Sequence, residues 1–274
     1  MLKRIAMGVI LFIYIILIFF SACTSLTKKQ PHISHVKLMD TALSSFEDNF
    51  LPNQNFVFLE KYAYFNEKEQ KFCSGDDLSI DCSFVPYGEG SAIAVKSIKN
   101  NVKILTAHHV CEEQMWEALN LIFENKDGEY DYPTFKIKAH FYGKEYTANI
   151  VKTDEDNDLC LLEIESEYGY KVENLKVADK KPELGETLYS ISAPLGISSK
   201  YTRLHFHGAW AGCDDALTGL PFCYFTIPAA PGSSGSGVFN RQGELVSIIS
   251  IAMSGFDEIS GGPRQYFIKE LIKN

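Results

Sequence analysis

Short apolar runs, separated by turn-forming residues, recur from Gly88 to the end of the chain and constrain its fold more than any other feature. Several runs alternate apolar and polar residues, as in Lys136-Ile137-Lys138-Ala139-His140-Phe141, which is typical of half-buried β-strands. Little room is left between the runs for helices. The pattern therefore predicts an all-β barrel or sandwich with strands over residues 91–95, 102–107, 134–141, 145–152, 159–164, 187–192, 203–210, 222–227, 237–240 and 245–252.

Two segments carry apolar residues at helical spacing. One begins at Cys111 and ends at Phe123, and the other is a closing helix over Arg264–Lys273. Residues 41–85 are an N-terminal extension with a possible short helix from Ala42 to Phe50, and the sequence leaves the rest of it unassigned. No repeat or linker interrupts residues 86–274, which we interpret as one domain.

The start of the chain has the three-part layout of an export signal. Lys3 and Arg4 form a basic start, an apolar run covers residues 5–20, and small residues lead to Cys23. The apolar run is shorter than the roughly 20 residues of a comfortable membrane span. We therefore predict that residues 1–23 are a signal segment that exports the chain.

Ser-Ala-Cys after such an apolar core resembles the signal of bacterial lipoproteins, in which the cysteine is diacylated and becomes the first residue. The resemblance implies lipidation at Cys23, a tether over residues 24–40 and attachment in the cell envelope, at the outer membrane or in the periplasm. Thr24 suggests sorting to the outer membrane, whereas Phe20 departs from the usual Leu. Two acyl chains anchor a protein stably. An uncleaved membrane anchor and simple secretion are the alternatives.

Composition excludes some classes of function. The chain has 46% hydrophobic residues, enough for a packed core, and a formal net charge of −9. Nucleic-acid binding needs a basic face, and the body of the chain has no dense Lys/Arg cluster. We therefore expect no nucleic-acid partner.

Six cysteines follow Cys23, and an exported chain meets an oxidising compartment in which disulfides form. We predict two disulfides that each bracket a short polar stretch: Cys73–Cys82 and Cys213–Cys223. Cys111 and Cys160 lie in apolar contexts and are expected to be buried thiols. No two cysteines form a CxxC pair, which argues against a structural zinc site.

A candidate nucleophile lies in Pro231-Gly232-Ser233-Ser234-Gly235-Ser236-Gly237-Val238. Glycines allow the backbone to turn tightly and expose the Ser234 hydroxyl. The N–H groups of Gly232 and Ser234 could then form an oxyanion hole. A Gly/Ser-rich surface loop is the alternative interpretation.

A weak serine nucleophile needs a base, and the base needs an orienting acid. An apolar strand ends at His108-His109, and Asp158 stands directly before another apolar strand. Each residue alone has a structural explanation. The order His, Asp, Ser favours a catalytic triad of His109, Asp158 and Ser234.

These motifs together resemble the trypsin-like serine peptidases, and among them the bacterial Deg/HtrA-type branch. Thr106-Ala107-His108-His109-Val110 matches the Thr-Ala-x-His block, Asp158-Leu159-Cys160-Leu161-Leu162 is similar to Asp-Leu-Ala-Leu-Leu, and Gly232-Ser233-Ser234-Gly235 matches Gly-Asn/Asp-Ser-Gly. The resemblance covers roughly residues 85–274. It implies two six-stranded antiparallel β-barrels with a C-terminal helix, and a serine endopeptidase acting on proteins or peptides without a cofactor or metal.

Further segments fall in the order of the family: Gly90-Ser91-Ala92-Ile93-Ala94-Val95, Leu184-Gly185-Glu186, Ala193-Pro194-Leu195-Gly196 and Asn240-Arg241-Gln242-Gly243-Glu244-Leu245-Val246. Two positions depart from it, because Ser236 replaces a second Gly and Gly237 replaces the common Pro. The sequence leaves no room for a PDZ domain after residue 274, so we expect no Deg-type regulation by peptides.

By the same resemblance, Pro228 forms the floor of the primary substrate pocket, and Ser250, Ile251 and Ala252 form its wall. No acidic residue stands at the floor to pair with Lys or Arg. We therefore predict a preference for a small or medium apolar residue on the acyl side of the cut.

The sequence also allows three alternatives. A protease-like fold that only binds its partner would keep the architecture without the chemistry. An α/β-hydrolase needs its His after the Ser, but the last histidine, His207, precedes Ser234. For a metal enzyme, the only histidine clusters in the sequence are His108-His109 and His205-x-His207, and there is no HExxH motif.

Overall fold

A computed structural model describes residues 53–66, 71–72, 82–112, 135–166, 172, 174–199, 202–214, 221–253 and 255–273. The chain divides into two units, Met1–Ser45 and Phe46–Asn274, and every described residue lies in the second. Outside the described residues lie the predicted signal with Cys23, the tether, the possible helix 42–50, and Cys73. Among the residues that are described, no helix has the length and apolar character that a membrane span requires.

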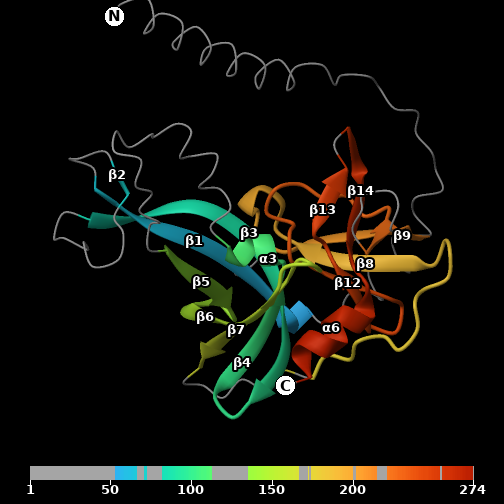
Figure 1. The fold of residues 1–274 in the computed structure, drawn as a ribbon, viewed down its shortest axis with the longest axis horizontal. Coiled ribbons are helices and arrows are strands. Elements are labelled where there is room, and N and C mark those ends of the chain that lie inside the picture. The colour runs from blue at the N-terminus through green and yellow to red at the C-terminus, as the bar shows by residue number, and fades with distance from the viewer. Residues whose placement is uncertain are drawn as a thin grey trace, which may run out of the picture. The chain divides into compact units, whose positions relative to one another are not determined.

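The first sheet closes on itself as a barrel. Its strand order is β2-β1-β3-β4-β7-β6-β5, and β1 also pairs with β5, so six of these strands form a ring (Figure 1). The strands are β1 Phe56–Asn66, β2 Lys71–Phe72, β3 Cys82–Ile98, β4 Asn101–Thr106, β5 Phe135–Phe141, β6 Lys144–Asp154 and β7 Leu159–Glu165.

Alternation along the strands fills the barrel. Along β1 and β5, buried residues alternate with residues that are at least partly exposed. The almost completely buried residues that fill the interior include Leu59, Ile93, Ile104 and Leu161. β1 lies in the segment that the sequence left unassigned, and β3 runs across residue 85. The barrel thus includes part of the predicted N-terminal extension.

The second sheet has seven strands in the order β12-β11-β8-β9-β10-β14-β13. Its core includes Leu188, Trp210, Phe225, Val238 and Val246. The strands are β8 Thr187–Ser192, β9 Leu204–Cys213, β10 Phe222–Phe225, β11 Gly237–Phe239, β12 Leu245–Ile248, β13 Ile251–Met253 and β14 Phe256–Pro263.

This second sheet is not closed within the described residues, so only one of the two expected barrels is observed. The outer edge of β12 is occupied by a neighbouring segment instead of another strand of the sheet. Leu245 N–H donates to the Lys176 carbonyl at 2.8 Å, and Ala178 N–H donates to the Leu245 carbonyl at 2.8 Å. The single strand expected over residues 245–252 is also divided, because Ser250 N–H bonds to the Gly261 carbonyl in β14.

Two short 3-10 turns and two helices complete the described elements: η1 Asn53–Asn55, η3 Pro194–Gly196, α3 His108–Cys111 and α6 Gln265–Ile272. The closing helix is confirmed as α6, which buries Ile268 and Leu271 and contacts strands of both sheets. The helix expected over residues 111–123 falls almost entirely outside the described residues.

Two disulfides are present among the described residues. Cys213–Cys223 is confirmed, joining the paired strands β9 and β10. The prediction of buried thiols at Cys111 and Cys160 was wrong, because these residues form a disulfide with each other. The β4–β7 pairing sets Thr106 opposite Cys160, and the one-turn helix after β4 then brings Cys111 over the same strand. The predicted Cys73–Cys82 bond stays a prediction.

The Cys111–Cys160 disulfide closes a sequence separation of 49, whereas Cys213–Cys223 closes only 10. Constraint of the unfolded chain makes the longer loop worth about 4 kcal/mol and the shorter one roughly 2.7 kcal/mol. We expect Cys111→Ala/Cys160→Ala to lower the free energy of unfolding by more than Cys213→Ala/Cys223→Ala, as measured by urea denaturation. An equal or smaller loss for the first pair would contradict this ranking.

Candidate active site

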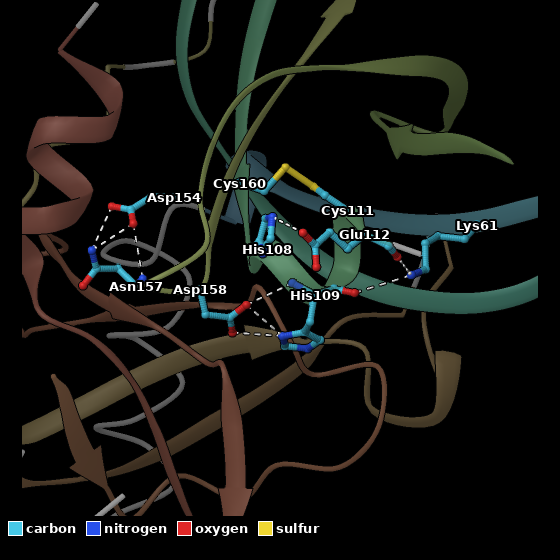
Figure 2. A network of polar contacts seen from close by, with 9 residues as sticks. All are labelled: Lys61, His108, His109, Cys111, Glu112, Asp154, Asn157, Asp158 and Cys160. Carbon is cyan, nitrogen blue, oxygen red and sulfur yellow. Dashed lines mark hydrogen bonds and ion pairs between the residues drawn. A yellow bond between two sulfur atoms is a disulfide. The ribbon is translucent and has the colours of Figure 1, made fainter. Parts of the chain in front are cut away.

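His109 and Asp158 form a close pair at the ends of two adjacent strands. His109 lies in α3 directly after β4, and Asp158 lies in the turn directly before β7, so the β4–β7 pairing brings them together. The Nδ1 atom of His109 lies 3.0 Å and 2.9 Å from the two carboxylate oxygens of Asp158 (Figure 2). The backbone N–H of His109 also donates to Oδ1 at 2.9 Å. This arrangement leaves Nε2 as the proton-accepting nitrogen of the ring.

The turn that carries Asp158 is held by its own side chains. Asp158 has a left-handed φ of 51°, a conformation that Asp adopts more readily than most residues. Its N–H donates to the Glu155 carbonyl at 3.1 Å. One residue earlier, the side chain of Asn157 donates to Asp154 at 2.9 Å (Figure 2). These bonds hold the Asp158 carboxylate in place beside the imidazole.

The one-turn helix α3 is fixed by three different kinds of contact. The buried amine of Lys61 donates to the carbonyl of Glu112 at 3.0 Å and to that of His109 at 3.5 Å. His108 Nε2 lies 2.7 Å from the Glu112 carboxylate. The disulfide of Cys111 ties the last residue of the helix to β7 (Figure 2). So short a helix would be marginal alone, and these contacts hold His109 in position.

The Gly/Ser-rich segment turns sharply where the sequence predicts it. Gly232 and Gly235 have φ values of 91° and 86°. A Cβ at Gly235 would lie 2.0 Å from the Ser91 carbonyl oxygen, and one at Gly232 would lie 2.4 Å from the Ala193 carbonyl oxygen. Both positions therefore require glycine. Between them, Ser234 is partly exposed.

The two predicted oxyanion donors, the N–H groups of Gly232 and Ser234, make no hydrogen bond within this turn. The N–H groups of the flanking residues are occupied, since Ser233 donates to Ala230 at 2.9 Å and Gly235 donates to Ile249 at 2.7 Å. Within the described part of the chain, the N–H groups of Gly232 and Ser234 donate to no other residue. They remain available to an incoming acceptor.

Ser91 joins the Ser234 segment to the barrel through all of its polar groups. Its N–H donates to the Ser234 carbonyl at 2.8 Å, and its Oγ donates to the Gly232 carbonyl at 2.8 Å. The same Oγ accepts the N–H of Ala193 at 3.0 Å, and its carbonyl accepts the Thr106 hydroxyl at 2.8 Å. Ser91 has no exposed surface. One buried residue on β3 thus fixes the position of the Ser234 turn.

The segments that carry His109 and Ser234 both lie against Gly90 of β3. A Cβ at Gly90 would lie 2.7 Å from the side chain of Val110, the residue after His109, and 3.6 Å from the Ser234 carbonyl oxygen. The residues that the structure describes include the His109–Asp158 pair but no hydrogen bond between Ser234 and His109. Such bonds are often long before substrate binds.

The residues of the predicted substrate pocket differ in exposure. Pro228 and Ala252 are exposed, Ile251 is partly buried, and Ser250 is buried. Ile251 pairs with Gly261 of β14, where a Cβ would lie 3.2 Å from the Ile251 side chain. Glycine at position 261 therefore leaves space beside the predicted wall.

The backbone accommodates both departures from the family pattern, whereas the buried Ser236 hydroxyl has no hydrogen-bond partner among the described residues. Ser236 is completely buried, and its backbone donates to the Ser233 carbonyl and accepts the N–H of Ile249. Gly237 begins β11, where a Cβ would lie 2.6 Å from the Phe239 ring. The turn therefore continues directly into the second sheet.

Sequence reasoning missed two of the supporting residues. Lys61 lies in the unassigned extension, and nothing in its local sequence distinguishes it from a surface lysine. Ser91 was part of a segment noted for its resemblance, but its hydrogen bonds depend on contacts between residues far apart in the chain.

The architecture is that of a known class of solved structures. A crystal structure of the serine endoprotease from Yersinia pestis is similar, with a TM-score of 0.56, 15% identity and coverage of 89% of this chain and 67% of that one. The likeness shows the fold alone. The family model of the trypsin-like peptidase domain matches residues 90–248, more than half of the chain. The chain therefore belongs to the trypsin-like peptidase family.

Similar curated proteins are larger than this chain. The serine protease Do-like HtrA of Bacillus subtilis is 27% identical over 183 residues, which are 64% of this chain and 35% of that protein. A probable periplasmic serine endoprotease, DegP-like, of Pseudomonas putida is 31% identical over 109 residues, or 39% and 22%. The chain thus spans about a third or less of the length of these relatives.

The role of Ser91 as an anchor can be tested by removing its hydroxyl. Ser91→Ala would leave the buried Gly232 carbonyl and Ala193 N–H without their partner, so we expect a loss of about 1 to 3 kcal/mol in the free energy of unfolding. Ser83→Ala on the same strand removes only an exposed bond of 3.4 Å to Phe65 and should cost less than about 0.5 kcal/mol. Equal losses in urea denaturation would refute the anchoring role.

Proposed function

We propose that this protein is a serine endopeptidase with His109, Asp158 and Ser234 as its catalytic triad. The observation that carries the proposal is the His109–Asp158 pair, which orients the imidazole through Nδ1. The glycine-flanked Ser234 turn supports it, because this turn and Val110 both lie against Gly90 of β3. The family supplies the reaction class, and the relatives' printed descriptions as serine proteases agree with it.

In the proposed mechanism the Ser234 Oγ attacks the carbonyl carbon of the scissile peptide bond. His109 Nε2 accepts the hydroxyl proton, while Asp158 holds the ring through Nδ1 and stabilises the imidazolium. The C–N bond then breaks as the same proton passes to the leaving amine, and an acyl-enzyme ester remains on Ser234. Water attacks this ester with His109 again as the base, which releases the acid and restores the hydroxyl.

The negative charge of the tetrahedral intermediate requires preorganised donors. We assign this role to the N–H groups of Gly232 and Ser234, which are not used by other described residues. Ser91 fixes the carbonyls of Gly232 and Ser234. The backbone N–H donors of this turn therefore need not reorganise during the reaction.

For the cellular location, the membrane attachment and the domain boundaries, we propose what the sequence predicts. We place the enzyme in the cell envelope, attached through lipid on Cys23 and a tether over residues 24–40, with residues 86–274 as the protease domain. The periplasmic relative supports this location. In this proposal the open second sheet corresponds to the second six-stranded barrel of the family.

Replacement of the nucleophile gives the direct test. Ser234→Ala should lower the turnover of a casein or peptide substrate by about a million-fold, because the triad acts as a unit. A fluorophosphonate probe should label the wild type and Ser233→Ala but not Ser234→Ala, with labelling located by mass spectrometry. An unlabelled wild type would instead favour a binding module that has the fold without catalysis, and hydrolysis by Ser234→Ala would exclude this nucleophile.

Cleavage specificity forms a separate prediction. The predicted pocket, from Pro228 to the wall at Ser250, Ile251 and Ala252, contains no carboxylate to pair with a basic side chain. In a peptide library read by mass spectrometry, we expect cleavage mainly after small or medium apolar residues. Preferential cleavage after Lys or Arg would show that the pocket is assigned incorrectly.

A further inference from the structure

Three side chains that bind metals well converge on the outer face of the first barrel. Glu60 comes from β1, His140 from β5 and Glu145 from β6. The Nε2 atom of His140 lies 2.5 Å from a carboxylate oxygen of Glu60. One donor atom of each of the three side chains lies within 4.8 Å of the other two. No other group of this kind is found among the described residues.

The strand register explains why these side chains meet. His140 is directly opposite Glu145 in the β5–β6 pair. Glu60 is opposite Lys138, which is two residues from His140 and on the same face of β5. Cross-strand and diagonal neighbours of this kind lie within reach of long side chains. The cluster therefore spans the β1–β5 pairing, which is the seam that closes the barrel.

Neighbouring side chains hold the donor groups in position. The hydroxyl of Tyr62 donates to Glu60 at 2.9 Å, and this bond raises the pKa of Tyr62. The Phe58 ring packs against the His140 ring at 5.6 Å between centroids. Supporting contacts of this kind orient ligands in metal sites and tune their affinity.

We propose that Glu60, His140 and Glu145 bind a zinc ion that bridges β1, β5 and β6 at the barrel seam. An imidazole with two carboxylates is a ligand set that zinc accepts, whereas calcium and magnesium prefer oxygen alone. Ligand bonds of about 2.0 to 2.2 Å in tetrahedral geometry place donor atoms roughly 3.4 Å apart. The His140 and Glu60 donors lie 2.5 Å apart, and the donors of all three side chains lie within 4.8 Å of one another, so their separations bracket this spacing.

Space for the remaining coordination position lies beside the cluster. A hollow of about 290 Å³ is lined by Glu60 and His140 together with Phe58, Tyr142, Ser199 and Arg203. Water can enter a polar space of this size and complete the coordination. The site is thus of the type with three protein ligands and one solvent ligand.

Lys138 is the natural competitor of the metal. Its charged amine lies 2.8 Å from a carboxylate oxygen of Glu145, where it competes with a metal ion for this ligand. The same amine lies 4.6 Å from the centre of the Tyr62 ring, which can hold it when a metal takes the carboxylate. Removal of this charge should therefore strengthen metal binding.

The test is a zinc chloride titration of the full chain by isothermal calorimetry. A His109→Ala background is used for every variant, so that the candidate active site contributes no zinc ligand. We expect one site whose affinity falls by at least about tenfold in His140→Ala and in Glu145→Gln. Lys138→Met should bind zinc more tightly than its parent. At a zinc concentration ten times Kd, the melting temperature should rise by about 3 to 6 °C.

His207→Ala is the matched control, because His207 is an exposed strand histidine outside the cluster. Unchanged zinc affinity in this variant supports the site. Equal weakening by His140→Ala and His207→Ala would show non-specific histidine binding and overturn the proposal. An affinity that Glu145→Gln leaves intact, or calcium binding in place of zinc, would overturn it as well. None of these outcomes depends on whether the protein cleaves peptides.

Discussion

The pairing of β4 with β7 sets Thr106 opposite Cys160, and the geometry of the candidate active site depends on this register. His109 follows one strand and Asp158 precedes the other, so the two side chains meet at the same end of the barrel. The Cys111–Cys160 disulfide crosslinks the two elements just beyond that point. A slip of one residue would turn each side chain to the opposite face and separate the imidazole from its carboxylate.

Close backbone approach then connects the two sheets. The Ser234 turn lies against β3 and β4 so tightly that a Cβ at Gly235 would overlap the Ser91 carbonyl oxygen and the Thr106 hydroxyl. Ser91 satisfies the buried polar groups at this contact. Buried backbone groups without partners would be costly, so the same bonds that stabilise the junction also shape the turn around the proposed nucleophile.

Much of this could be predicted from local patterns. Short apolar runs predicted β4 to β7 and part of β3, apolar residues at helical spacing predicted the closing helix α6, and glycines marked the turn at Ser234. They did not predict β1. Lys61 could not be found in this way. Its role depends on β1 lying beside α3, because there the Lys61 amine donates to the carbonyls of His109 and Glu112. Nothing in the neighbouring sequence encodes that meeting.

By itself, the sequence determined most of the short segments that form strands, although not β1 or β14, and which residues carry the proposed chemistry, because periodicity and residue type are local properties. Tertiary structure alone decided that Cys111 and Cys160 are bonded, that β1 closes the barrel against β5, and that Glu60 meets His140. It also decided that the second sheet stays open where the 176–178 segment covers β12. These outcomes depend on strand register and on competition for sheet edges, which bring together residues that are far apart along the chain.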